Sequence, residues 1–173
     1  MINKYREIIE KRIKNISLDK YPESLYEPIK YFFGLGGKRI RPALTMMSCE
    51  AFGCNPTKAL DAALSVETFH NFTLIHDDIM DSAETRRNGD TVHKKWNLNK
   101  GILSGDRMLI LAYQLLENYD SKMYHELTIL LNKTAEQVCE GQQLDIDFES
   151  KLDTNYDQYI EMITLKTAVL LGL

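Results

Sequence analysis

Apolar residues repeat along almost the whole of this 173-residue chain at the three-to-four-residue spacing of an α-helix, and this repeat constrains the fold most. The first segment shows it at Tyr5, Ile8, Ile9, Ile13 and Ile16. Only 4 prolines and 9 glycines interrupt the chain, and no segment convincingly alternates apolar and polar residues as a strand does. The sequence therefore predicts an all-α fold, built as a single helical domain over residues 1–173.

Breaks in the helical pattern set the expected helix ends. Gly34, Gly36 and Gly37 end the second segment, and Asn55 followed by Pro56 is a typical helix start. The polar residues after the fourth helix predict a loop over 82–90. The expected helices cover residues 3–16, a short stretch ending near 33, and residues 38–52, 56–81, 102–118, 122–145 and 156–171.

Composition excludes several classes of protein. A net charge of -4 lacks the basic excess of a nucleic-acid-binding protein. No stretch approaches the roughly 18 apolar residues of a membrane span, and the N-terminal segment lacks the apolar core of a signal peptide. Cys49, Cys54 and Cys139 form no CxxC pair, which predicts a cytoplasmic protein with three reduced, buried thiols.

Three carboxylates gather on one arc of a helix in the motif HDDIMD. Asp77, Asp78 and Asp81 fall within about 100° of one another on an ideal helix. Like charges so close destabilise a helix unless a cation offsets them, and Mg²⁺ binds through one or two carboxylates together with substrate phosphates. Because the cluster follows an apolar run over residues 69–75, the sequence favours a Mg²⁺ site over a solvated acidic helix end.

Basic residues gather in two further motifs. In GLGGKRIRP, Lys38, Arg39 and Arg41 stand at an expected helix start, where free N–H groups and the helix dipole attract anions. Arginine offers a fork for phosphate oxygens and lysine a mobile point charge, so this run predicts a phosphate site. In TRRNGDTVH, Arg86 and Arg87 follow the carboxylates, and they either bind phosphate or pair with nearby acidic side chains.

Two residues carry weaker signals. His70 lies about 20° from Asp77 on the helical wheel, and it is either a hydrogen-bonded core residue or a ligand. Lys166 lies in an apolar stripe, where it must find an anion or extend to the helix edge. Gln142 and Asp145 of GQQLD share a helix face and would add polar groups to a site.

In order and spacing, GGKRIRP, HDDIMD, RRNGDTVH, GILSGD, GQQLD and YIEMITLKTAVLLGL closely resemble the trans-isoprenyl diphosphate (polyprenyl) synthase family over residues 21–173. The resemblance implies an isoprenoid-synthase-type helical bundle, of which this chain would be the N-terminal half. It implies a prenyltransferase that condenses isopentenyl diphosphate with an allylic diphosphate, with Mg²⁺ as cofactor. The apolar faces that half a bundle exposes predict association into a homodimer.

The resemblance also assigns roles to residues. It implies that the diphosphate of isopentenyl diphosphate is held by Lys38, Arg41, His70 and Arg87. It implies that the Mg²⁺ ions on the allylic diphosphate are bound by Asp77 and Asp81, supported by Asp78. It implies further contacts to the allylic diphosphate from Arg86, Lys166 and Thr167. It implies a pocket floor, limiting products to twenty carbons or fewer, at Phe72 and Thr73.

One departure from the family and three competing functions remain. The family's second aspartate-rich motif is missing and its members are roughly twice as long, so we expect a truncated bundle that is inactive alone. Such a chain would be a fragment or a non-catalytic subunit. A metal-dependent phosphohydrolase using His70, His76 and Asp77 would need further ligands and leaves GGKRIRP unexplained. A terpene cyclase shares the DDxxD element but needs no isopentenyl diphosphate site.

Overall fold

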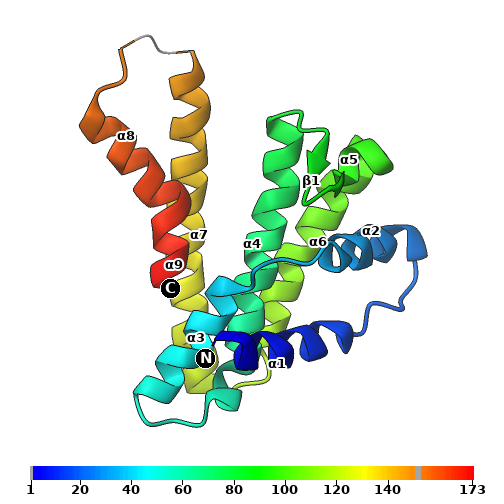
Figure 1. The fold of residues 1–173 in the computed structure, drawn as a ribbon, viewed down its shortest axis with the longest axis vertical. Helices are drawn as coiled ribbons and strands as arrows, with labels where there is room; N and C mark the ends of the chain where they lie inside the picture. Colours follow the sequence, from blue (N-terminus) through cyan, green and yellow to red (C-terminus); the bar gives the residue numbers. More distant parts are fainter. Residues whose placement is uncertain (1, 151–152) are drawn as a thin grey trace. The chain divides into compact units, whose positions relative to one another are not determined.

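The computed structural model describes residues 2–150 and 153–173, and nearly all of its regular structure is helical (Figure 1). The all-α prediction is therefore confirmed. The chain divides into two compact units, the first ending at Asn118 and the second beginning at Tyr119. The expectation of one domain over residues 1–173 stays a prediction.

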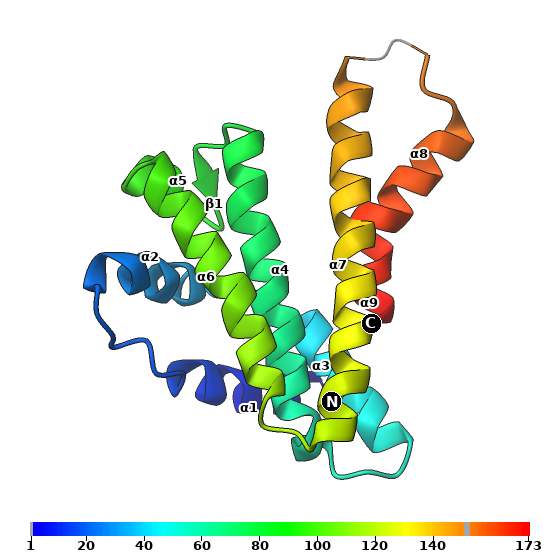
Figure 2. The same cartoon turned by 180° about the vertical axis from the view of Figure 1, so that it is seen from behind.

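The first unit carries most of the helices. They are α1 (Ile2–Lys14), α2 (Glu23–Gly34), α3 (Ile40–Ala51), α4 (Leu60–Met80), α5 (Val92–Lys95) and α6 (Leu98–Leu116). A 3-10 turn, Pro56–Ala59, precedes α4, and its cap is Asn55, whose side chain accepts a hydrogen bond from the Thr57 amide. Figures 1 and 2 show α4 and α6 running side by side.

A small hairpin replaces the loop expected after α4. Strand β1 (Thr85–Arg86) pairs antiparallel with β2 (Gly89–Asp90). The two residues between them, Arg87 and Asn88, both have positive φ, at 52° and 65°. Positive φ at both turn residues is the geometry of tight hairpins, and asparagine at position 88 adopts it more readily than most residues. The expectation of an unstructured loop was therefore wrong here.

The loop between α2 and α3 extends further than the sequence predicted. Helix α3 begins at Ile40 rather than near residue 38, because Arg39 takes a left-handed backbone with φ 52°. Gly37 has φ 158°, and a Cβ there would lie 3.2 Å from the guanidinium groups of both Arg39 and Arg87. Glycine is needed at this point because the loop backbone runs directly against two arginine side chains.

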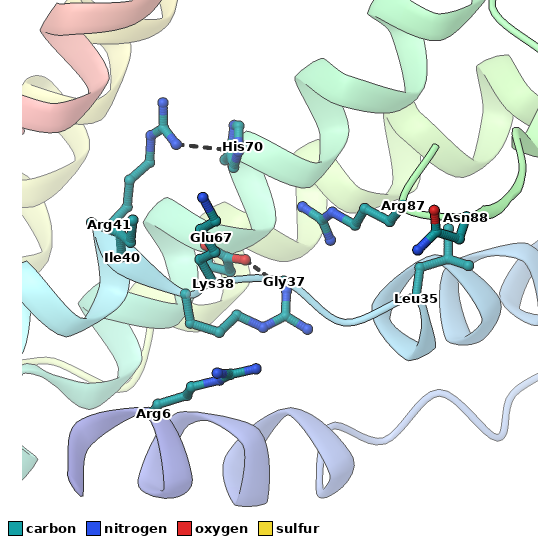
Figure 3. Close-up of a pocket in the computed structure, with 11 residues that line it drawn as sticks. Arg6, Leu35, Gly37, Lys38, Ile40, Arg41, Glu67, His70, Arg87 and Asn88 are labelled. Carbon is teal, nitrogen blue, oxygen red and sulfur yellow. Dashed lines mark hydrogen bonds and ion pairs between the residues drawn. The ribbon is translucent and has the colours of Figure 1, made fainter. Parts of the chain in front are cut away.

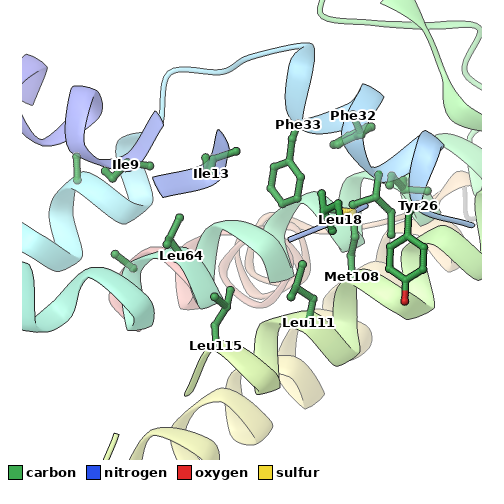
Figure 4. Close-up of a cluster of buried hydrophobic side chains, with 14 of the residues drawn as sticks. Ile9, Ile13, Leu18, Tyr26, Phe32, Phe33, Leu64, Met108, Leu111 and Leu115 are labelled. Carbon is green, nitrogen blue, oxygen red and sulfur yellow. The ribbon is translucent and has the colours of Figure 1, made fainter. Parts of the chain in front are cut away.

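The core of the first unit joins α1 to the helices that follow it. The apolar face of α1 is buried, with Tyr5, Ile9 and Ile13 at 1%, 0% and 6% exposure. Figure 4 shows Ile9 and Ile13 in one cluster with Phe33 of α2 and apolar side chains of α4 and α6. Helix α1 is therefore held in place by the core of this unit.

Helix α4 buries polar as well as apolar side chains. Its buried polar residues are Ser65, Glu67, Thr68, Asn71 and Asp78. Ser65 donates a hydrogen bond to the Ala112 carbonyl of α6 at 2.7 Å. Buried polar groups are costly unless they find partners. The buried polar residues of α4 therefore need hydrogen-bond or ion-pair partners, as Ser65 finds on α6.

The second unit is a helical hairpin. It consists of α7 (Ser121–Glu149), α8 (Tyr156–Ile163), a π-helix (Thr164–Ala168) and α9 (Val169–Gly172). The continuous helix expected over 156–171 is thus interrupted by the π-helix. A Cβ on Gly141 of α7 would lie 2.6 Å from the Lys166 Cα, so this glycine lets α7 contact the π-helical backbone directly.

Two expectations about surfaces have separate outcomes. The prediction that all three cysteines are buried was wrong: Cys49 is partly exposed, while Cys54 in the turn after α3 and Cys139 on α7 are exposed. Apolar spacing did not distinguish the inner from the outer face at these positions. Among the described residues, no helix combines the length and the apolar character that a membrane crossing requires.

We predict that Gly105→Ala destabilises the first unit by about 1–2 kcal/mol. A Cβ at Gly105 of α6 would overlap the imidazole of His76 on α4. That ring would then lose its 3.1 Å contact with the Ile102 carbonyl and its edge contact with Phe72. Urea unfolding followed by circular dichroism measures the change.

Gly34→Ala is the matched control, because it makes the same substitution where a Cβ meets nothing within 4 Å. Since Gly34 is the last residue of α2, we expect an unchanged or slightly higher stability. Equal effects from the two variants would contradict the close approach of α4 and α6 as the reason for a glycine at position 105.

Candidate functional site

A cavity of about 550 Å³ opens in the first unit between the loop that precedes α3 and the middle of α4 (Figure 3). It brings together all four residues expected to hold one diphosphate: Lys38, Arg41, His70 and Arg87. Arg6, Arg39 and Glu67 also line it. Five cationic side chains therefore face a single carboxylate, which makes the cavity suited to an anion.

His70 contacts Arg41 in the cavity wall. Arg41 Nη1 lies 3.3 Å from His70 Nε2, and because an arginine can only donate, this ring nitrogen must accept. Burial, and then the positive charge of Arg41, lower the pKa of His70 from 6.5 to about 3. His70 is therefore neutral at physiological pH and carries its proton on Nδ1, where it can donate to an anion.

Arg87 is fixed between the glycine loop and α4. Its Nη1 donates to the Gly36 carbonyl, its Nη2 lies 3.5 Å from Asn71 Oδ1, and its guanidinium lies 5.7 Å from the Phe32 ring centroid. Burial and the neighbouring Arg39 lower the pKa of Arg87. A cation that is crowded by another cation in a buried setting gains most from a bound anion.

Arg39 has a structural role, although the sequence grouped it with the phosphate-binding cations. Its side chain is 0% exposed. Its three donor groups bond to Glu10 at 2.8 Å, to Glu67 at 2.7 Å and to the Phe33 carbonyl at 3.1 Å. Burial raises the pKa of Glu67, and Arg39 opposes that rise. The pair joins the loop to α4, and each of the three nitrogens of Arg39 already donates to a protein group.

The three aspartates at the end of α4 have different surroundings. Asp78 is 1% exposed and forms an ion pair with Arg86 at 2.7 Å, so Arg86 does pair with a nearby acidic side chain, one of the two roles left open for it. Burial raises the pKa of Asp78, while the bond to Arg86 lowers it. Asp77 is partly exposed, and Asp81 is exposed at the C-cap. The three carboxylates expected on one arc of the helix therefore differ in exposure, because Asp78 is buried while Asp77 and Asp81 remain accessible.

The carboxylates that remain accessible fit a magnesium ion. Over residues 2–150 and 153–173, no group of three or more His, Cys, Asp or Glu side chains is placed to hold a metal. Asp77 and Asp81 are one helical turn apart, and two carboxylates with phosphate oxygens and water satisfy Mg²⁺. The phosphohydrolase alternative lacks its ligand group in the described residues, since His70 contacts Arg41 and His76 contacts the Ile102 carbonyl.

In the second unit, Lys166 finds a carboxylate rather than extending to solvent. It lies in the π-helix and forms an ion pair with Asp145 of α7. Gln142, one turn earlier on α7, has a buried Nε2 without a hydrogen-bond partner in the described structure. Thr167 is exposed. The GQQLD motif thus positions the lysine through Asp145 and through the close approach at Gly141.

The two residues expected to floor the pocket lie on α4, and both are half-buried. The Phe72 ring contacts Phe69 at 5.5 Å and His76 at 4.8 Å between centroids. Thr73 donates from Oγ1 to the His70 carbonyl at 2.8 Å. Their role in setting product length stays a prediction.

Sequence analysis missed three residues that shape the cavity. Glu67 could have been found, because a carboxylate inside the apolar run of α4 requires a buried cation as partner. Asn71, which contacts Arg87, carries a weaker signal of the same kind. Arg6 gives no sequence signal, since it looks like any basic residue on the polar face of an amphipathic helix.

A family model described as polyprenyl synthetase matches residues 22–173. A short chain isoprenyl diphosphate synthase of Methanothermobacter thermautotrophicus is 40% identical over 173 residues, covering 99% of this chain and 53% of the relative. A geranylgeranyl diphosphate synthase of Methanosarcina mazei is 43% identical over 151 residues, covering 86% of this chain and 47% of the relative. The chain thus spans about half the length of the curated relatives it matches.

Solved structures agree with these matches. A geranylgeranyl pyrophosphate synthetase from Geoglobus acetivorans superposes with a TM-score of 0.94 at 36% identity, covering 99% of this chain and 56% of that one. The likeness confirms the expected isoprenoid-synthase type of helical fold. The chain again covers little more than half of the neighbour.

We predict that His70 stays neutral between about pH 8 and pH 5. Its pKa of about 3 lies below the ordinary 6.5. Between about pH 6.5 and pH 3 the unfolded chain therefore binds a proton at this residue that the folded chain does not. The stability gained from a neutral His70 is therefore complete above about pH 6.5 and is lost as the pH falls toward 3. NMR of the imidazole signals, with His70→Gln used to identify the signal of His70, should show no titration of that signal between about pH 8 and pH 5 in the folded chain.

The same histidine signal in the urea-unfolded chain is the internal control, and it should titrate near the ordinary histidine value of about 6.5. A folded-state midpoint near that value would contradict both the burial of His70 and the assignment of its proton to Nδ1.

Proposed function

Because the chain belongs to the polyprenyl synthetase family, we propose that it takes part in joining isopentenyl diphosphate to an allylic diphosphate. The observation that carries the proposal is the cavity in which Lys38, Arg41, His70 and Arg87 converge. An excess of cations in a partly desolvated cavity favours a multiply charged anion. The named activities of the relatives support a diphosphate ester as that anion.

Each cavity residue has a distinct part in holding isopentenyl diphosphate. Arg41 and Arg87 offer planar forks, while Lys38, exposed at the loop, acts as a mobile point charge. His70 donates from Nδ1. An anion beside Arg41 would also offer an acceptor to its Nε, which is buried without a partner in the described structure. These groups would fix the diphosphate and so position the double bond at its other end.

We place the allylic diphosphate at the aspartate end of α4. Asp77 and Asp81 would hold Mg²⁺ there, and bound Mg²⁺ neutralises charge that develops on a leaving diphosphate. Asp78 keeps Arg86 oriented through their ion pair. The roles of Lys166 and Thr167 at this diphosphate stay predictions from the family resemblance.

In the proposed reaction, the bonds that break and the bonds that form all belong to the two substrates. The carbon–oxygen bond of the allylic diphosphate breaks, and the diphosphate leaves with the electron pair. The double bond of isopentenyl diphosphate then attacks the allylic cation, and a neighbouring carbon loses a proton to restore a double bond. The departing diphosphate is the proposed base. The protein contributes positioning and charge stabilisation.

A second candidate function is a non-catalytic, substrate-binding subunit. It is favoured by the sequence, in which HDDIMD is the single DDxxD motif. Helix α6 exposes Leu103 and Ile110 at 57% and 53%, and this apolar surface supports the proposed association into a homodimer. A cytoplasmic location also stays a prediction.

We predict that the 173-residue chain binds isopentenyl diphosphate but turns over little or none of it with Mg²⁺ and an allylic diphosphate. One carboxylate pair holds only part of the metal charge, and each tenfold loss of rate is about 1.4 kcal/mol of barrier. Calorimetric titration measures binding and mass spectrometry measures products. Arg41→Gln should weaken binding about tenfold by removing a charged donor.

The control for this experiment is Lys133→Gln, which removes the same charge from an exposed position on α7. Its affinity for isopentenyl diphosphate should equal that of the wild type. An unchanged affinity in Arg41→Gln would defeat the assignment of the cavity. Turnover at the rate of an intact synthase would show that this chain alone completes the catalytic site.

We predict that Phe72→Ala lengthens the product beyond that of the unaltered enzyme, because it removes a large ring from α4 near the first aspartate. Phe52→Ala, which removes the same ring from a position 90% exposed at the end of α3, is the matched control and should leave the product unchanged. The measurement is chromatography of the prenyl products made by a preparation of the enzyme that shows turnover. Identical product lengths for Phe72→Ala and the wild type would count against this floor.

A further inference from the structure

Helix α1 contributes to the cavity a basic side chain that belongs to none of the sequence motifs. Arg6 lines the cavity with the loop residues and α4, and Figure 3 shows it on α1, across from the loop that carries Gly37 and Lys38. This helix precedes residues 22–173, which the family model matches. None of the residues assigned so far to diphosphate binding comes from α1.

Specific contacts hold the position of α1. Tyr5 and Ile9, on either side of Arg6, are 1% and 0% exposed in the core. Tyr5 bonds through its hydroxyl to Glu50 of α3, and Arg12 pairs with Asp61 of α4 at 3.2 Å. Arg6 therefore stands at the cavity on a helix that is anchored to both α3 and α4.

The acidic groups close to Arg6 are already occupied. Glu10 lies one turn after Arg6 on the same face of α1, and it pairs with Arg39 at 2.8 Å. Glu67, the carboxylate in the cavity wall, also pairs with Arg39, at 2.7 Å. Within residues 2–150 and 153–173, no ion pair is formed by Arg6. An exposed cation beside other cations, with its nearby carboxylates taken, is placed to bind an anion.

We propose that Arg6 is a further substrate-binding residue that closes the cavity on the diphosphate from the side of α1. The inference rests on the proposed function and extends it by adding Arg6 of α1, which is exposed, to a cavity in which Arg39 is held by Glu10 and Glu67. Arg6 would bind a charged group remote from the reacting double bond. Its removal should therefore raise the KM for isopentenyl diphosphate and leave kcat unchanged.

The test is calorimetric titration of the 173-residue chain with inorganic diphosphate in metal-free buffer, which keeps the aspartates from recruiting the anion through Mg²⁺. Arg6→Gln should weaken binding roughly five- to tenfold, and Arg6→Lys should restore part of the loss. The wild-type affinity should also fall more steeply with salt than that of Arg6→Gln. Lys11→Gln, an exposed cation on α1 that does not line the cavity, is the matched control and should bind as the wild type does.

The outcomes separate this inference from the proposed function. If Arg41→Gln loses affinity while Arg6→Gln binds like the wild type, the cavity binds diphosphate and the inference about Arg6 is wrong. If the wild type does not bind diphosphate, the proposed function of the cavity and the role of Arg6 are both wrong. Equal losses in Arg6→Gln and Lys11→Gln would reduce the effect to net charge and would also overturn the inference.

Discussion

The buried ion pair between Arg39 and Glu67 holds the cavity together. It lies where the loop before α3 meets the middle of α4, and Glu10 ties the same guanidinium to α1. Separating buried charges typically costs about 3–5 kcal/mol when one partner is removed. That cost explains how Arg39 can keep a left-handed backbone at the N-cap of α3. It also fixes the loop so that the residues on either side of Arg39 face the cavity.

The other cationic side chains are arranged by the same helix. Glu67, His70 and Asn71 occupy positions i, i+3 and i+4 of α4, which share one face, and they contact Arg39, Arg41 and Arg87 respectively. One turn of a helix thus sets the spacing of three arginines, two from the loop and start of α3 and one from the hairpin after α4. Burial lowers the pKa of Arg41, and burial together with the neighbouring Arg39 lowers the pKa of Arg87. A bound anion would favour the charged form of both.

Much of this could be predicted because it depends on local order. Helical spacing placed His70 and the aspartates on one helix, and the basic run GGKRIRP marked the loop that lines the cavity. The different roles of chemically similar residues could not be predicted in this way. Arg39 and Arg41 are two positions apart and chemically identical. Arg39 nevertheless forms ion pairs with two carboxylates, while Arg41 faces the cavity. Asp77 and Asp78 are neighbours of the same type, yet Asp78 is buried and Asp77 is partly exposed.

The sequence by itself determined the all-helical class, the family and four of the residues that gather at the cavity, because periodicity and motif spacing are properties of neighbouring residues. Tertiary structure decided which charges are paired. Pairing depends on burial and on partners such as Glu10 and Glu67, which are separated from Arg39 by 29 and 28 positions in the chain. It also decided that Arg6 reaches the cavity, since only packing of α1 against α3 and α4 places that side chain there.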